Sequence, residues 1–367
     1  MSVKSSKDVL IKSLPTVIPA EIPVHGFDEI IDVRSPSEFS EDHIQGAINL
    51  PVLDDEERSR VGRVYKQVSS FEARRMGAGL VSANIARHFK FHFSSKGNPY
   101  KPLIYCWRGG QRSASLATVL SEVGWQVHLL DGGYREFRRF VSKSIEDIFN
   151  QEVDLRVVSG FTGSGKTSLL KRLDEKGHQV IDLEGLAQHK GSALGEDPQF
   201  EQPSQKRFEN LLLRQLSAMD FSRPVYVESE SSRIGRVQVP VAMWSRMKEA
   251  PVLELEVPLK VRAHYLLGEY EHFTKFPEKL LQKMDPILSM HGSKRGNQWK
   301  TSIDKGDYLT FVTSLLEDHY DPAYLKSRNN TYSSPVARLE MESVCTEALD
   351  QVIGEVLNLE QSPLINS

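Results

Sequence analysis

The stretch LRVVSGFTGSGKTSLLKRL, residues 155–173, constrains the fold more than any other part of this chain. It begins with an apolar run, continues with eight residues that fit GxxxxGK followed by Ser or Thr, and ends in a helix-forming run. Glycines let backbone N–H groups curl around phosphate oxygens, and the lysine and hydroxyl that follow can contact phosphate and Mg²⁺. The order of strand, loop and helix therefore predicts a P-loop in an α/β sheet. A glycine-rich turn without a ligand is the alternative.

Seven residues of this loop and of the helical turn after it are expected to hold phosphate: Gly160, Gly163, Ser164, Gly165, Lys166, Thr167 and Ser168. A P-loop protein that hydrolyses nucleotide usually has an Asp at the end of an apolar strand to position Mg²⁺. The matching stretch here, PVYVESES, offers Glu228 or Glu230 instead. The sequence thus favours a diphosphate site over nucleotide hydrolysis, and it leaves open whether the loop also binds nucleotide or Mg²⁺.

Two polar clusters, DLEGLAQHKGSALG (182–195) and ESESSRIG (228–235), follow strand-like runs in the same half of the chain. Open α/β sheets bind ligands at the carboxyl ends of their strands, so both clusters are expected to border the P-loop. The residues predicted to bind substrate there are Asp182, Glu184, His189, Lys190, Glu228, Glu230 and Arg233. Solvated loop charges are the alternative for each of them, and which carboxylate does acid–base or metal work stays open.

One of the two cysteines, Cys106, lies in YCWRGGQRSASL, between a strand-like and a helix-like run. Backbone N–H groups at such a turn, together with Arg108 and Arg112, favour the thiolate and attract an oxyanion. A cysteine that only filled a core would need neither the glycines nor the arginines, so Cys106 is the candidate nucleophile. Cys345 is expected on a C-terminal helix without a chemical role. Because the two cysteines lack CxxC spacing, we expect neither a disulfide framework nor a cysteine zinc site, and no metal site is assigned.

The first half of the chain resembles rhodanese sulfurtransferase domains. The resemblance rests on DVRSPSEFSEDHIQGAINLPV, residues 32–52, and on the cysteine loop. It implies that Asp32 and Arg34 order the fold around the active loop, and that the cysteine carries a chalcogen atom. Five residues separate Cys106 from Arg112, a longer loop that resembles the cysteine phosphatases of this fold. For this domain taken alone, phosphatase activity is therefore an alternative.

A rhodanese domain followed by a P-loop domain, with YCWRGGQRS, GFTGSGKT and DLEGLAQHKGSALG in one chain, resembles the tRNA 2-selenouridine synthase family over residues 32–327. The resemblance implies that wobble 2-thiouridine of tRNA is S-geranylated from geranyl diphosphate and then receives selenium from selenophosphate. These are co-substrates, and no tightly bound cofactor is expected. Lys166 would stabilise the departing diphosphate, while Cys106, Arg108 and Arg112 would serve selenation. Whether Cys106 carries covalent selenium stays open.

Two rival functions are kept. The first is an ATP-dependent sulfurtransferase or kinase-like enzyme, in which the P-loop hydrolyses nucleotide and Cys106 delivers sulfur. The second is a nucleotide-sensing binding module in which the rhodanese fold is only a scaffold. The weak match to a magnesium-binding Asp counts against the first, and the complete cysteine loop counts against the second.

The predicted fold class is α/β: a rhodanese-like parallel-sheet domain at 12–144, a P-loop NTPase-like domain at 152–330, and a helical C-terminal segment at 331–367. The chain has 39% hydrophobic residues, no apolar run that could span a membrane, and no signal-like core at its N-terminus. We therefore expect a cytoplasmic protein without a membrane partner. The sequence does not indicate the oligomeric state.

Contact with tRNA must come from local patches, because the net charge of the chain is only −3. The segment 57–79 carries six Lys and Arg against two Glu, and the segment 291–300 has three basic residues and no acidic one. Trp299, in the second segment, is expected to stack on a base. Solvated helix faces are the alternative for both segments.

Overall fold

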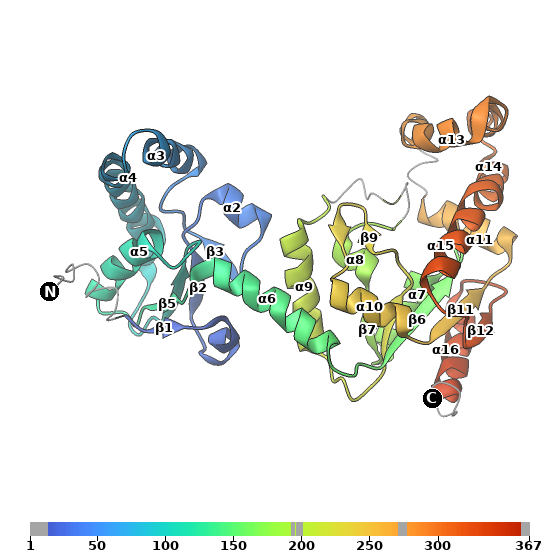
Figure 1. Cartoon of the computed structure of the whole chain (residues 1–367), viewed down its shortest axis with the longest axis horizontal. Coiled ribbons are helices and arrows are strands. Elements are labelled where there is room, and N and C mark those ends of the chain that lie inside the picture. The colour runs from blue at the N-terminus through green and yellow to red at the C-terminus, as the bar shows by residue number, and fades with distance from the viewer. Residues whose placement is uncertain (1–13, 192–194, 196–200, 271–276, 361–367) are drawn as a thin grey trace. The chain divides into compact units, whose positions relative to one another are not determined.

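The structure is a computed structural model that describes residues 14–191, 195, 201–270 and 277–360 (Figure 1). Its contacts divide the chain into two compact units, and the division falls between Ser144 and Ile145, inside helix α6 (Gly133–Phe149). The predicted ranges also include residues 12–13, 192–194, 196–200, 271–276 and 361–367, which lie outside the described residues. Each unit is built on its own parallel sheet.

The sheet of the first unit has five parallel strands in the order β1-β5-β4-β2-β3. The strands are β1 (Thr16–Val17), β2 (Glu29–Asp32), β3 (Ala47–Asn49), β4 (Pro102–Tyr105) and β5 (His128–Leu130). Every residue of β4 is buried, as expected for a central strand covered on both faces. Cys106 follows directly after β4, so the cysteine loop begins at the carboxyl end of the central strand.

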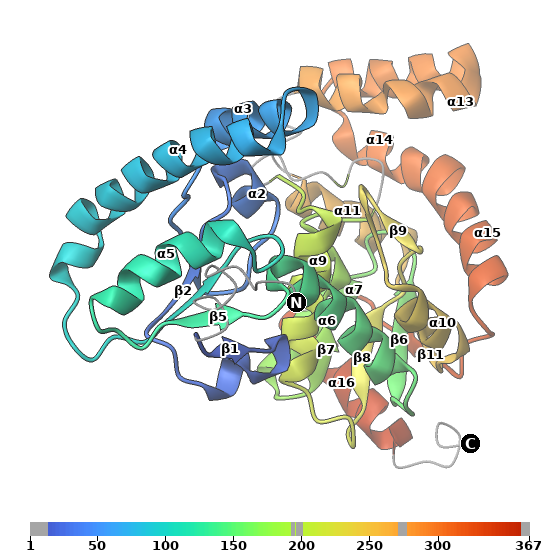
Figure 2. The ribbon, with the colours of Figure 1, turned by 60° about the vertical axis from the view of Figure 1, so that its left-hand side comes forward.

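Besides α6, the helices of the first unit are α2 (Pro36–Glu41), α3 (Asp55–Gln67), α4 (Ser70–Phe91) and α5 (Gln111–Glu122). Helix α5 packs on β4 and β5, and its apolar residues join a core that includes Leu116 and Leu120. Helices α3 and α4 lie side by side as a hairpin (Figure 2). Asp54 starts α3 with a capping box, in which its side chain accepts from the backbone of Glu57.

The sheet of the second unit also has five parallel strands, in the order β12-β11-β6-β8-β7. The strands are β6 (Leu155–Gly160), β7 (Gln179–Ile181), β8 (Val225–Glu228), β11 (Val252–Glu256) and β12 (Ala337–Glu340). A separate short hairpin consists of β9 (Arg233–Ile234) and β10 (Val237–Gln238). Strand β6, which is buried throughout, leads into the P-loop. Two parallel sheets with covering helices confirm the predicted α/β fold class.

The helices of the second unit are α7 (Lys166–Glu175), α8 (Leu183–Ala187), α9 (Gln205–Ser217), α10 (Val241–Glu249), α11 (Leu259–Glu269), α13 (Pro277–Asp304), α14 (Tyr308–Leu315), α15 (Asp321–Thr331) and α16 (Thr346–Glu360). Helices α7 and α16 pack together over β6, β11 and β12 around one apolar cluster. A π-helical turn, Leu316–Tyr320, joins α14 to α15. The chain from α11 to α15 is thus a largely helical insertion between neighbouring strands β11 and β12.

Two predictions about the C-terminal half are wrong in detail. The tail from residue 331 is not helical throughout, because Ala337–Glu340 pairs with β11 before α16 begins, and exposed Cys345 precedes that helix. Trp299 is only 1% exposed, and its indole N–H donates to Ser314 Oγ at 2.9 Å, so it cannot stack on a base. It fills the apolar core between α13 and α14. In the described part of the chain, no helix combines the length and apolar character needed to cross a membrane.

Candidate active site

The P-loop depends on glycine at two positions between β6 and α7. Gly163 and Gly165 have φ of +82° and +80°, which L side chains rarely adopt. A Cβ on Gly163 would lie 2.9 Å from Leu266 Cγ, and one on Gly165 would lie 2.6 Å from a methyl carbon of Val344. The Oγ of Ser164 is buried and makes no hydrogen bond within the described residues. Leu266 and Val344 therefore pack tightly against the P-loop, while the hydroxyl of Ser164 remains available to bind a ligand.

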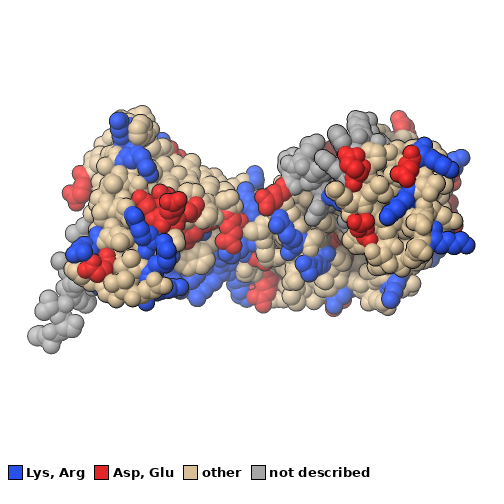
Figure 3. All heavy atoms as spheres, turned by 90° about the horizontal axis from the view of Figure 1, so that it is seen from above, with Lys and Arg blue, Asp and Glu red and all other residues tan. Residues whose placement is uncertain are grey.

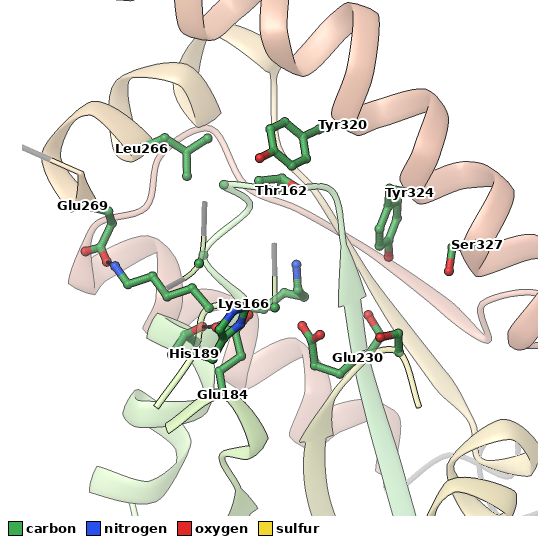
Figure 4. A pocket seen from close by; sticks show the side chains of 18 of the residues that line it. Thr162, Lys166, Glu184, His189, Glu230, Leu266, Glu269, Tyr320, Tyr324 and Ser327 are labelled. Atoms are coloured by element: carbon green, nitrogen blue, oxygen red, sulfur yellow. Dashed lines mark hydrogen bonds and ion pairs between the residues drawn. The ribbon is translucent and has the colours of Figure 1, made fainter. Parts of the chain in front are cut away.

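Lys166 and Thr167 connect the loop to its surroundings. The Nζ of Lys166 donates to the carbonyl oxygen of Gly160 at 2.8 Å, and the N–H of Gly160 donates to Tyr324 Oη at 2.8 Å. The hydroxyl of Thr167 donates to Glu184 Oε2 at 3.2 Å. Figure 4 shows the Lys166 side chain beside Glu230 and below Tyr324. The cation of the loop thus faces both a carboxyl group and an aromatic ring.

Three glutamates gather at the carboxyl ends of β7 and β8. Glu228 is 1% exposed and accepts a hydrogen bond from the backbone N–H of Glu184 at 2.8 Å. Burial, and next the negative charges of Asp182 and Glu184, raise the pKa of Glu228 well above its ordinary value. Burial and the charge of Glu184 raise the pKa of Glu230 to about 8, although nearby Lys166 opposes the shift.

The carboxyl groups of Glu184 and Glu230 face each other and influence each other's pKa. Burial raises the pKa of Glu184, with Lys166 opposing the shift. Because the pKa of Glu230 is raised to about 8, this carboxyl group holds a proton near neutral pH. This pair can therefore take up or release a proton beside the P-loop.

A cavity of about 660 Å³ opens over the P-loop. The predicted residues that line it are Gly163, Gly165, Lys166, Thr167, Asp182, Glu184, His189, Lys190 and Glu230. Glu228 lies behind this wall, and Ser168 Oγ bonds instead with Tyr265 Oη at 2.8 Å. Arg233 is exposed on β9, donates to the carbonyl of Gly235, and is not among the lining residues. Most of the predicted polar residues are thus brought to one cavity.

The opposite wall of the cavity comes from the helical insertion, which sequence reasoning missed. Its aromatic and apolar members are Tyr265, Leu266, Tyr270, Tyr320, Tyr324 and Tyr332. In Figure 4, Leu266 and Tyr320 lie across the cavity from Glu184. The four-residue spacing of Tyr320 and Tyr324 was a usable signal, because it places both on one face of a helix. The cavity therefore combines a polar, phosphate-type floor with an aromatic wall.

Arg262 fixes this wall to the P-loop. It is 4% exposed, and its Nη1 donates to the carbonyl of Thr162 at 3.1 Å. The same guanidinium forms a two-pronged ion pair with Asp321, at 2.9 and 2.7 Å. Its charge also lies 4.9 Å from the centre of the Phe161 ring. One buried side chain thus links the loop, α11 and the start of α15.

Mg²⁺ at this site would meet the Thr167 hydroxyl and the carboxyl groups of Glu184 and Glu230. Magnesium sites commonly use one or two carboxylates and complete the shell with substrate phosphates and water, so these oxygens fit the ion once Glu230 loses its proton. Among the residues that the structure describes, no group of three or more His, Cys, Asp or Glu side chains is arranged to hold a metal. Any such ion would depend on ligand oxygens.

The second site is the cysteine loop of the first unit. Cys106 is 3% exposed, and its Sγ accepts from the backbone N–H of Gly110 at 3.3 Å and from Ser113 Oγ at 3.2 Å. Arg108 is exposed and forms no ion pair with a described residue. Arg112 instead donates to Glu38 Oε2 at 2.6 Å. The thiol thus receives two donors, with one uncommitted arginine beside it.

Asp32 and Arg34 form a buried ion pair in the first unit. Arg34 donates to Asp32 through its backbone N–H, its Nε and its Nη2, and it also donates to the carbonyl of Asp42. Its guanidinium carbon lies 3.7 Å from the centre of the Tyr134 ring. The backbone N–H of Tyr134 in turn donates to the carbonyl of Cys106 at 2.8 Å. The pair therefore supports the cysteine loop through one intermediate residue.

Comparisons with known proteins agree with this division. A family model described as the AAA domain of tRNA 2-selenouridine synthase matches residues 153–353, and a rhodanese-like model matches residues 20–140. A tRNA 2-selenouridine synthase of Bdellovibrio bacteriovorus is 39% identical over 89% of this chain and 93% of its own length. One of Hahella chejuensis is 35% identical over 80% of this chain and 84% of its own.

Among solved structures, a rhodanese-related protein from Thermoplasma volcanium covers 34% of this chain and 92% of its own. At 16% identity and a TM-score of 0.23, this similarity is too low to add to the argument. The family model and the curated relatives suffice, because they span most of both units. The chain is a member of the tRNA 2-selenouridine synthase family.

Proposed function

We propose that this enzyme converts 2-thiouridine at the wobble position of tRNA to 2-selenouridine. The sulfur is first alkylated by geranyl diphosphate and is then replaced by selenium from selenophosphate. The observation that carries the proposal is the presence in one chain of two anion cradles with different surroundings, a cavity with an aromatic wall and a loop around a thiol. Family membership supports tRNA as the substrate, and a cytoplasmic location stays a prediction.

The first step belongs to the P-loop cavity. Backbone N–H groups of the loop would bind the diphosphate, and Lys166 would balance the charge that grows as the carbon–oxygen bond breaks. The apolar geranyl chain would lie against the wall that includes Leu266 and Tyr320. Support for this placement comes from the pairing of a phosphate-type floor with an aromatic wall.

Alkylation of the sulfur also releases a proton. When an HN–C=S group becomes N=C–S–R, a sulfur–carbon bond forms, the carbon–oxygen bond of geranyl diphosphate breaks, and the proton on N3 must leave. The pair Glu184 and Glu230, when ionised, would accept that proton. A base works best when its pKa is close to the working pH, and the pKa of Glu230, about 8, meets this condition.

The second step belongs to the cysteine loop. Sulfide is a poor leaving group, but the alkylated sulfur can depart as geranyl thiolate. The Cys106 thiolate would displace the geranyl thiolate at C2, and selenium of selenophosphate would then bond to C2 as the Cys106 thiolate leaves. Water would finally cleave the phosphorus–selenium bond to give phosphate. No electrons enter or leave in this balance. Arg108, which is exposed beside the loop, would bind the incoming oxyanion next to Cys106.

Two single substitutions test the proposal. Cys106→Ser should abolish selenium incorporation while geranylated nucleoside stays detectable, and Lys166→Ala should lose both products, because alkylation comes first. Lys176→Ala is the matched control, since this lysine pairs with Asp350 at the far end of α7. The readout is mass spectrometry of nucleosides from tRNA treated with each purified variant. Normal selenation by Lys166→Ala would contradict the proposed order.

The rival functions predict other outcomes. Rapid ATP turnover by the purified protein, with no effect of geranyl diphosphate, would support a kinase-like sulfurtransferase. Unchanged tRNA nucleosides in cells that carry Cys106→Ala would support a binding module. Either result would overturn the two-step scheme.

A further inference from the structure

The turn between α3 and α4 exposes three large apolar side chains within seven residues. Tyr65, Val68 and Phe71 are 62%, 69% and 64% exposed. Isolated exposed apolar residues are ordinary, but two aromatic rings and a valine at one turn form a patch. The hairpin itself is well packed, because Ala73, Gly77 and Ile85 of α4 are buried. The exposed patch is therefore a feature of an ordered turn.

Unpaired positive charges surround this patch. Arg60, Arg63 and Lys66 on α3 and Arg74 on α4 are exposed, and none forms an ion pair with a described residue. Between residues 60 and 79 the only acidic residue is Glu72, which pairs with the neighbouring Arg75 at 2.6 Å. Figure 3 looks onto the end of the first unit where α3 and α4 lie, and it shows Lys and Arg atoms beside uncharged surface, with a separate group of Asp and Glu atoms on the same face. The surroundings of the patch thus favour a polyanion.

The base of the hairpin is fastened to the rim of the cysteine loop. Ser37 donates to Asp55 at the start of α3, with Oγ and Oδ1 2.5 Å apart. Glu38 lies between Arg58 of α3, at 4.0 Å, and Arg112 of the loop, at 2.6 Å. The 13 residues of α3 extend about 20 Å from this base. A strand bound along the hairpin would therefore run from its turn toward Cys106.

We propose that the turn of the α3–α4 hairpin, residues 65–71, binds a single-stranded loop of the substrate tRNA. Unpaired bases stack on Tyr65 and Phe71, while Arg60, Arg63 and Lys66 contact phosphates. This inference rests on the proposed function for its ligand, a tRNA. A second copy of this chain is the competing occupant, but an apolar dimer contact would gain nothing from a border of unpaired cations.

The test compares the Tyr65→Ala/Phe71→Ala double variant with Phe91→Ala. Phe91 is 73% exposed at the other end of α4, so its substitution removes an equally exposed ring away from the turn. The probe is a fluorescent anticodon stem–loop that contains 2-thiouridine, titrated at several salt concentrations. The double variant should bind at least about tenfold more weakly, and Phe91→Ala should match the wild type. Tyr65→Phe should retain affinity, because stacking needs the ring and not the hydroxyl.

Charge provides the second arm. Arg63→Ala should weaken binding of all RNA sequences alike and reduce the slope of log affinity against log salt by about 0.7–0.9. Affinity of the double variant within twofold of wild type would overturn the inference while the proposed function stands. If the double variant lost only self-association in sedimentation, the surface would be a dimer contact instead. Failure of the wild type to bind the stem–loop would overturn both.

Discussion

The cysteine loop and the P-loop begin alike and end in different surroundings. Each follows a buried central strand of a parallel sheet and leads into a helix, so each aims backbone N–H groups at one point. In the first unit, Gly133 packs against the loop, and Cys106 is 3% exposed. In the second unit, a cavity of about 660 Å³ separates the helical insertion from the P-loop. The shared turn provides anion binding, whereas the opposing segment decides what else can enter.

The tight closure of the cysteine loop gives the largest expected effect. Gly133 has φ +63°, and a Cβ there would lie 2.3 Å from the carbonyl oxygen of Cys106. Gly133→Ala should therefore displace the loop and abolish selenation, while alkylation in the other unit continues. Gly124→Ala is the matched control, because Gly124 has φ +97° but open space around it. Both products are measured by mass spectrometry of nucleosides, and normal selenation by Gly133→Ala would show that closure is not needed.

The open cavity of the second unit depends on Arg262. Arg262→Ala would leave Asp321 and the Thr162 carbonyl without their buried partner, which typically costs about 3–5 kcal/mol. We expect denaturant unfolding of the second unit at a clearly lower midpoint, together with weaker binding of geranyl diphosphate. Lys260→Ala, an exposed change on the same helix, should behave as wild type. An unchanged midpoint for Arg262→Ala would mean that the wall is held by other contacts.

The two loops and the cavity wall differ in how well they can be predicted from the sequence. The two loops were located correctly because a strand, a glycine-rich turn and a helix are encoded within about twenty residues. The wall of the cavity could not be predicted in the same way. Helical spacing shows that Tyr320 and Tyr324 share one face of a helix, but it does not show which part of the protein that face contacts. The burial of Arg262 could not be predicted from the sequence. An arginine in a helix is expected to be exposed to solvent unless its partner, here Asp321, is known.

The errors have equally local causes. Strand β12 is only four residues long and is followed by an amphipathic helix. Its alternation of buried Leu339 with exposed Arg338 and Glu340 is too short to be distinguished from the pattern of that helix, so the sequence predicts helix there. Trp299 stands among basic residues in the sequence, but α13 directs its ring inward, while the next residue, Lys300, is exposed. Residues that are adjacent in sequence thus face opposite environments.

Glu184 and Glu230 give a prediction with a smaller expected effect, which concerns how the rate of alkylation depends on pH. If Glu230 accepts the proton, the rate of alkylation should rise with pH up to about 8 and then level off. Glu230→Gln should lower that rate about 100-fold and remove this rise, while Glu249→Gln, an exposed change, should do neither. The measurement is single-turnover alkylation between pH 6 and 9. The same pH profile in Glu230→Gln would assign proton transfer to another group.

The same pair makes stability depend on pH. Because the folded pKa of Glu230 lies above its ordinary value of about 4.3, the folded state binds more protons between that value and about pH 8. The free energy of unfolding of the second unit should therefore fall as pH rises through this window, and Glu230→Gln should flatten the fall. Thermal unfolding of both proteins at several pH values measures the difference. Equal slopes would show that Glu230 ionises freely in the folded protein.

The smallest effect concerns the charge beside the cysteine. Although partial burial opposes it, the bond with Arg112 lowers the pKa of Glu38, so this carboxylate stays ionised and neutralises Arg112 at neutral pH. Glu38→Gln should release Arg112 toward an incoming anion and lower the KM for selenophosphate up to about fivefold, with kcat unchanged. The effect should be small because an ion pair that is still partly open to water contributes little net free energy. Glu56→Gln, an exposed loss of the same charge on α3, should leave KM as it was. A higher KM in Glu38→Gln would instead mean that Glu38 holds Arg112 in its binding position, and that the cysteine loop is preorganised more fully than the P-loop.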